Sequence, residues 1–183
     1  MTLTIAFSQL NPTVGDVAGN TTLVRQARDD AAAQGADLVV FSELVLVGYP
    51  PEDLVLRPAL VEAAAVALRD LERESAVPGS PGLVVTLPWK HNGRVRNTVA
   101  LVANGRSELR FKHELPNYGV FDEKRVFEPG PLPEPVTFRD AHLAKFRAQV
   151  LAVPEWDGSF VDSHEIGKSY GTASALLMLS RCR

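Results

Sequence analysis

The stretch FSELVLVGYPPEDL, residues 41–54, decides how the rest of the chain is interpreted. It follows the apolar run ADLVV, residues 36–40, whose length and β-branched content are typical of a buried strand. Glu43 comes where that strand is expected to end. Because the carboxyl ends of strands face the ligand crevice in α/β proteins, Glu43 is a candidate general base. The alternative is a glutamate that only faces water at a strand end.

The composition is that of one globular domain. The chain has 183 residues, 45% of them hydrophobic and 22% charged, with a net charge of −3. It lacks the basic excess typical of nucleic-acid surfaces and any apolar run of the roughly 20 residues that span a bilayer. We therefore expect no nucleic acid and no membrane as partners and, given a start without leader features, a cytoplasmic location. The single cysteine, Cys182, excludes an internal disulfide and a multi-cysteine metal site.

The first part of the chain predicts a strand, a helix and a second strand. Residues 3–9 form an apolar strand pattern, and apolar residues recur at helical spacing over residues 21–34. Asn20 is expected to cap that helix and Gly35 to end it in the left-handed conformation. A strand, helix and strand in so short a space predict a parallel pair with a right-handed crossover.

The middle of the chain predicts another helix and a β-hairpin. Pro58 is typical of a first helical turn, and residues 58–74 continue with helical spacing of apolar positions. Residues 82–88 predict a third buried strand, and residues 95–111 alternate around Asn104-Gly105, a strong hairpin signal. The predicted fold class is α/β with a mixed sheet.

Lys112 ends the second strand of that hairpin and begins the stretch KHELPNYGVFDEKRVF, residues 112–127. Its ammonium is expected to be partly desolvated between Phe111 and Leu115. An acidic neighbour would then either hold its charge or exchange a proton with it. The alternative is a solvated lysine at a strand end.

FSEL, GYPPEDL and residues 112–127 together resemble the first two catalytic motifs of the nitrilase, or carbon-nitrogen hydrolase, superfamily. The chain is most similar to the amino-terminal glutaminase domain of glutamine-dependent NAD synthetases, and the resemblance covers residues 1–139. It implies a nitrilase-like αββα sandwich with a mixed sheet, incomplete in this chain.

The resemblance implies a role for four residues. Glu43 matches the general base and Lys112 the lysine that stabilises the tetrahedral oxyanion, a division of labour that thiol attack on an amide requires. Glu123 matches a second glutamate beside the lysine, and Tyr118 a wall of the glutamine pocket. The alternatives are a solvated loop residue for Glu123 and a packed loop aromatic for Tyr118.

The third motif is where the sequence departs from the family. Relatives carry a catalytic cysteine after a short apolar strand, but residues 137–160 contain no cysteine. The nucleophile is therefore unassigned, since Cys182 lies one residue from the end of the chain. Residues 140–183 form a divergent tail whose apolar residues, among them Leu143 and Val150, are expected to pack less well than those before it. A frameshift, a truncation or a genuine short protein would each give such a tail.

The expected function is hydrolysis of the glutamine side-chain amide, which supplies ammonia for NAD synthesis, by a truncated or altered form without its nucleophile. The resemblance implies glutamine as substrate, no cofactor for this part and self-association into a homo-oligomer. ATP and deamido-NAD would belong to a synthetase domain that is absent here. No metal is expected, because the histidines lack metal-ligand spacing. The alternative is a non-catalytic nitrilase-fold module for binding or assembly.

Overall fold

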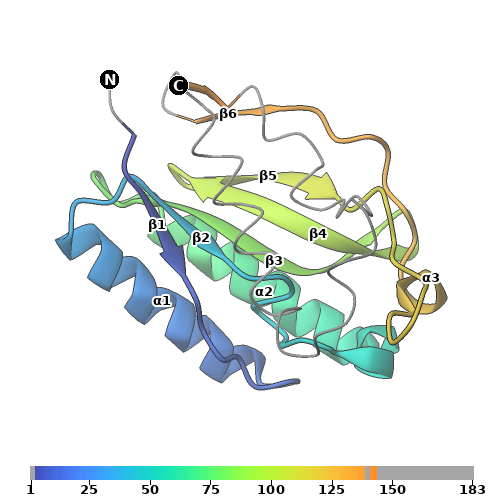
Figure 1. Ribbon diagram of the computed structural model, residues 1–183. Helices are drawn as coiled ribbons and strands as arrows, with labels where there is room; N and C mark the ends of the chain where they lie inside the picture. Colours follow the sequence, from blue (N-terminus) through green and yellow to red (C-terminus); the bar gives the residue numbers. More distant parts are fainter. Residues whose placement is uncertain (1–2, 139–140, 144–183) are drawn as a thin grey trace.

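A five-stranded mixed sheet forms the centre of the computed structural model, which describes residues 3–138 and 141–143. The strands lie in chain order: β1 (Ile5–Ser8), β2 (Leu38–Phe41), β3 (Gly82–His91), β4 (Arg94–Ala103) and β5 (Arg106–Phe111). The first three strands are parallel, and β4 and β5 continue antiparallel. The sheet stays open, with β1 and β5 at its edges (Figure 1).

Both long helices cover the same face of this sheet. Figure 1 shows α1 (Val17–Ala33) and α2 (Pro58–Glu74) side by side on one side of the strands. Right-handed crossovers give this arrangement, because β1, β2 and β3 advance across the sheet in one direction. The shorter elements are η1 (Glu52–Leu56), α3 (Glu123–Val126), β6 (Val136–Phe138) and β7 (Ala141–Leu143), of which β6 and β7 pair with each other.

Strand alternation divides the core between the two faces of the sheet. Val39 and Phe41 of β2 belong to the larger apolar cluster, which the helices complete. Leu38 and Val40 face the other way, into a smaller cluster that Val136 and Phe138 of β6 join. The predicted fold class, α/β with a mixed sheet, is therefore confirmed. No helix within the described residues has the length and apolar character needed to cross a membrane.

The start of α1 differs from the prediction at Asn20. The helix begins one turn earlier, because the side chain of Asp16 accepts a hydrogen bond from the Gly19 N–H at 2.9 Å and caps it. Asn20 lies inside the helix and is buried. Its side chain instead bonds both backbone groups of Thr13, at 2.8 Å each, so it holds the preceding loop against the helix. Gly35 follows the helix with φ +77°, as predicted.

The antiparallel part begins one strand earlier than predicted. β3 runs on to His91, and a tight turn at Asn92-Gly93 pairs it with β4. This turn has the same dipeptide as the predicted turn at Asn104-Gly105, and all four residues have φ between 50° and 79°. Positive φ at both central residues is the geometry that makes Asn-Gly favour two-residue hairpins. The signal was therefore present in the sequence at both places.

The predictions for the tail and for Cys182 concern residues beyond the described part. Apart from the backbone of Ala141–Leu143, the tail at 140–183 lies outside the described residues, and so does Cys182. The poor packing expected of the tail, including that of Val150, stays a prediction.

Replacing Gly48, in the loop after β2, should destabilise the fold strongly. Gly48 has φ +81°, and a Cβ there would lie 2.6 Å from the Val14 Cα. We expect Gly48→Ala to lose roughly 1–2 kcal/mol of unfolding free energy to left-handed strain and about 1–3 kcal/mol more to the clash. The matched control is Gly79→Ala, with φ +83° and nothing within 4 Å, which should show the strain alone. Equal losses in urea unfolding would contradict the close approach.

Candidate active site

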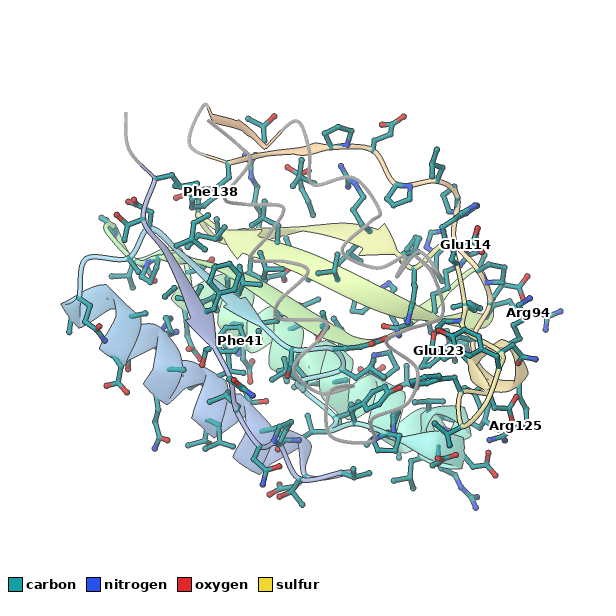
Figure 2. The ribbon with its side chains drawn as sticks, viewed as in Figure 1. Phe41, Arg94, Glu114, Glu123, Arg125 and Phe138 are labelled. Carbon is teal, nitrogen blue, oxygen red and sulfur yellow. The ribbon has the colours of Figure 1, made fainter. Side chains whose placement is uncertain are left out.

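Three charged side chains from distant parts of the chain meet at one end of the sheet. The Lys112 Nζ lies 2.8 Å from the Glu43 Oε1 and 2.8 Å from the Glu123 Oε1. Glu43 follows β2, Lys112 follows β5 and Glu123 begins α3. Figure 2 shows Glu123 at the end of the molecule opposite Phe138. Glu43 and Lys112, to which the resemblance gives parts in one reaction, are thus in direct contact.

The sheet topology explains why Glu43 and Lys112 meet. β2 and β3 are parallel, β4 runs in the opposite direction, and β5 runs parallel to β3 again. The carboxyl ends of β2 and β5 therefore lie at the same end of the strands. The Lys112 N–H donates to the Asn97 carbonyl of β4 at 2.9 Å, which extends the β4–β5 ladder by one bond. The position of Lys112 is therefore set by strand register.

Thr86 of β3 holds the turn that presents Glu43. Its hydroxyl donates to the Ser42 carbonyl at 2.6 Å and accepts from the Val45 N–H at 3.1 Å. Leu44 adopts φ 51°, so the chain turns sharply just after Glu43. The side chain of Glu43 remains 33% exposed, which leaves it accessible at the edge of the sheet.

Glu123 is positioned by α3 and by contacts around that short helix. Its N–H donates to the Pro116 carbonyl at 3.1 Å, and its carbonyl accepts from the Phe127 N–H at 2.8 Å. Arg125, labelled beside Glu123 in Figure 2, pairs with Asp53 of η1. The helix that carries Glu123 is thereby tied to the loop region that follows Glu43.

Lys112 is a buried cation. Its side chain is only 4% exposed, and this burial by itself disfavours the ammonium. The negative charges and hydrogen bonds of Glu43 and Glu123 outweigh that cost, so the pKa of Lys112 lies above its ordinary value. Of the two behaviours left open by the sequence, the structure favours a lysine that keeps its charge over one that exchanges a proton.

Glu123 titrates near neutrality. Burial is the largest cause, and the negative charge of Glu43 adds to it, while Lys112 acts in the opposite direction. Together they raise the pKa of Glu123 from 4.5 to about 7. Its Oε2 is buried and accepts no hydrogen bond from the described residues. The alternative of a solvated loop glutamate is therefore wrong for Glu123.

Two tyrosines lie in the segments that follow Glu43 and precede Glu123 in the chain. Tyr118 is half-buried and packs edge-on against Phe121, with ring centroids 5.6 Å apart. Tyr49 is half-buried as well; burial first, and then the charges of Glu43 and Glu123, raise its pKa far above the ordinary value. Tyr118 also acts on Tyr49 electrostatically, so the two phenols lie near each other. Tyr49 was missed by sequence reasoning although it lies inside residues 41–54.

Asn97 is a second residue that sequence reasoning missed. It lies in β4, is 1% exposed, and its Nδ2 donates to the Glu43 Oε1 at 2.6 Å. The one available signal was an asparagine inside a predicted strand, where this residue type is depleted.

Two kinds of group are missing from the described part of the chain. Residues 3–138 and 141–143 include no cysteine, so no thiol can be placed beside Glu43 and Lys112. The same residues hold no cluster of three His, Cys, Asp or Glu side chains suited to a metal ion.

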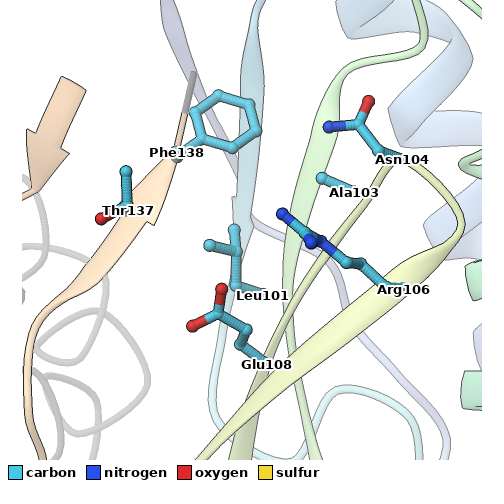
Figure 3. A pocket seen from close by; sticks show the side chains of 7 residues that line it. All are labelled: Leu101, Ala103, Asn104, Arg106, Glu108, Thr137 and Phe138. Atoms are coloured by element: carbon cyan, nitrogen blue, oxygen red, sulfur yellow. The ribbon is translucent and has the colours of Figure 1, made fainter. Parts of the chain in front are cut away.

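A small pocket lies away from the charged residues. It has a volume of about 50 Å³ and is lined by residues of β4, β5 and β6, with Asn104 and Arg106 on one side and Phe138 on the other (Figure 3). Arg106 begins β5, whereas Lys112 follows its other end. The pocket is therefore separate from the candidate site.

The raised pKa of Glu123 predicts a change of stability with pH. Between pH 4.5 and about 7 the native state binds this proton more tightly than the unfolded state, so the free energy of unfolding falls as pH rises through that window. Glu123→Gln should remove on the order of 2 kcal/mol of this fall. The measurement is urea unfolding at pH 5 and pH 8.

The matched control for this measurement is Glu128→Gln. Glu128 lies five positions along the chain in an exposed environment, so the same chemical change should leave the pH dependence as it is. Equal pH dependence in the unmodified chain and in Glu123→Gln would contradict the raised pKa.

The curated relatives are synthetases of a much greater length. The chain is 41% identical over 136 residues to the glutamine-dependent NAD(+) synthetase of Xylella fastidiosa (strain Temecula1 / ATCC 700964), which covers 70% of this chain and 24% of the relative. It is 39% identical over 129 residues to the enzyme of the same name from Thermotoga maritima, covering 70% and 22%. The chain thus spans about a quarter of the length of these relatives.

Solved structures give the same picture for the fold. A glutamine-dependent NAD+ synthetase from Acinetobacter baumannii, in complex with ADP, superposes with a TM-score of 0.69 at 33% identity, over 74% of this chain and 26% of that one. An amidase from Nesterenkonia sp. AN1, shown with acrylamide added at its active-site cysteine, superposes with a TM-score of 0.65 at 26% identity, over 77% and 55%.

The comparison with family models covers most of the chain. The carbon-nitrogen hydrolase model matches residues 4–156, which include Glu43, Lys112 and Glu123. The match extends past residue 139, and the predicted boundary there stays a prediction. With this match and the relatives above, the chain belongs to the carbon-nitrogen hydrolase family.

Proposed function

We propose that this chain carries the base and the cation of a site that hydrolyses the side-chain amide of glutamine. The observation that carries the proposal is the buried Lys112 ammonium, held at 2.8 Å from both Glu43 and Glu123. A fixed cation next to an accessible carboxylate is the arrangement that acyl transfer from an amide requires. Glu43 is the base, and Lys112 stabilises the oxyanion.

Each side chain has a defined part in the proposed reaction. Glu43 takes the proton of a thiol, and the thiolate attacks the amide carbon to give a tetrahedral oxyanion next to Lys112. The intermediate collapses to a thioester, and the leaving nitrogen takes the proton from Glu43 and departs as ammonia. Glu43 then deprotonates a water, which cleaves the thioester to glutamate and regenerates the thiol. Glu123 keeps Lys112 charged and in place.

The choice of glutamine rests on the relatives. The curated relatives that match about 70% of this chain include glutamine-dependent NAD(+) synthetases. We assign walls of the glutamine pocket to Tyr49, on which the charges of Glu43 and Glu123 act, and to Tyr118, which acts on Tyr49. The ammonia would serve NAD synthesis in the cytoplasm, by a synthetase domain that uses ATP and deamido-NAD. Self-association into a homo-oligomer is part of the same proposal.

Whether the site turns glutamine over or only binds it depends on the presence of a nucleophile. The only cysteine of the chain is Cys182, and residues 137–160, where the family carries its thiol, have none. We therefore propose that the chain as written binds glutamine without turning it over. The alternative function, a non-catalytic module for binding or assembly, rests on this same observation.

Binding of glutamine is the direct test of the proposal. Isothermal titration calorimetry should detect binding of glutamine to the unmodified chain. Glu43→Gln and Lys112→Met should each weaken this binding about tenfold or more, because each variant removes a charged contact. Lys90→Met is the matched control, because Lys90 is exposed at the end of β3. Absence of glutamine binding by the folded, unmodified chain would refute the proposed substrate.

Ammonia release tests the missing nucleophile. We expect the purified chain to release no ammonia from glutamine above the background of Glu43→Gln, because a base and a cation without a thiolate give no acyl-enzyme. Turnover that disappears in Cys182→Ser would mean that the terminal cysteine reaches the site. Turnover that survives in Cys182→Ser would require a mechanism in which water attacks directly.

A further inference from the structure

We infer that Asn97 is a positioning residue that fixes which oxygen of Glu43 accepts the proton. The inference deepens the proposed function and depends on it only for the role of Glu43 as base. Asn97 and Lys112 both donate to the Oε1 of Glu43, and the Oε2 is thereby reserved for the reaction.

The hydrogen bonds of the Glu43 carboxylate are one-sided. The Asn97 Nδ2 lies 2.6 Å and the Lys112 Nζ 2.8 Å from the same Oε1. The hydrogen bonds from the Asn97 amide and the Lys112 ammonium therefore end on one oxygen, while Glu123 interacts with Glu43 as a second carboxyl group. The side chain of Glu43 is 33% exposed, so the carboxylate as a whole is not sealed from solvent.

The two donors are held at a fixed spacing by the sheet. Thr98 pairs with Phe111 across β4 and β5, and the next bond joins the Lys112 N–H to the Asn97 carbonyl at 2.9 Å. Alternation along β4 places Asn97 on the same face as Val99 and Leu101, opposite the helices. Asn97 and Lys112 are thus cross-strand neighbours, so the ladder fixes the spacing of the two backbone positions from which the donor groups extend.

Two donors do what one cannot. The last torsion of a glutamate side chain is broad and two-fold, so a carboxylate that is bonded only to an ammonium can rotate and exchange its oxygens. A second, neutral donor on the same oxygen opposes this rotation. It adds no charge to a site whose ammonium already faces Glu43 and Glu123.

The orientation of the Asn97 amide follows from the same contact. With its Nδ2 toward Glu43, its Oδ1 is buried and has no partner among the described residues. Reversing the amide would place that oxygen against a carboxylate oxygen, two acceptors in contact without a hydrogen. The unpaired Oδ1 is the cost of keeping the donor on Glu43, and the contact is strong enough to hold it there.

The first test is a double-mutant cycle on the unfolding equilibrium constant at pH 8. The proteins are the unmodified chain, Glu43→Gln, Asn97→Leu and the double variant. Asn97→Leu should raise the unfolding constant about tenfold more in the unmodified background than in Glu43→Gln, because only a charge-assisted bond couples the two sites. Additive effects of the two changes would overturn the inference.

Thr98→Val is the matched control for the cycle. Thr98 is the next residue of β4, is 0% exposed and lies on the opposite face, so it loses a buried polar group without touching Glu43. Its effect should add to that of Glu43→Gln. Equally large coupling between Thr98→Val and Glu43→Gln would also overturn the inference. It would mean that any change at this end of β4 affects the stability contributed by Glu43.

A second readout does not require Asn97→Leu to fold. In the unmodified chain, NMR should show one Nδ2 proton of Asn97 shifted downfield and protected from solvent exchange, as expected for a short bond to a carboxylate. Glu43→Gln should move this proton upfield and speed its exchange, and an unchanged resonance would contradict the inference. Neither readout uses glutamine, so a failure of the proposed substrate is seen separately in the binding titration.

Discussion

The burial of one ammonium group is the constraint on which the candidate site depends. Moving Lys112 out of water costs several kcal/mol, and only close, well-formed pairs with anions offset a cost of that size. Glu43 and Glu123 provide two such pairs, each at 2.8 Å. Because each pair offsets part of this cost, assembly of the strand end after β2, the strand end after β5 and α3 stabilises the buried ammonium.

The architecture around this group serves the same requirement. Parallel β2 and β3, followed by two antiparallel returns, bring Glu43 and Lys112 to one edge of the sheet. Glu123 comes from a helix of four residues, which Arg125 links to η1. The carboxylates differ in environment: Glu43 is one-third exposed, whereas Glu123 is buried with a pKa of about 7. That difference suits an accessible base beside a carboxyl group that supports the lysine.

Most of the fold was predictable because its signals are local. Pro58 and the spacing of apolar residues after it identified α2, and Asn104-Gly105 identified the β4–β5 turn. The errors were local as well. Asn20 was assigned to a cap because its residue type favours that position, but a competing aspartate one turn earlier caps α1. The Asn92-Gly93 turn carried the same signal as the second hairpin and was overlooked.

The sequence by itself determined that the ionisable residues Glu43 and Lys112 follow strands. Glu43 and Lys112 each follow a strand pattern, and the motifs around them indicated a shared chemistry. Only the tertiary structure decided how they are held. The bond from Asn97 to Glu43, the burial of Glu123 and the approach of Tyr49 join residues far apart in sequence. Cross-strand register and desolvation set these contacts, and both depend on neighbours that no local pattern specifies.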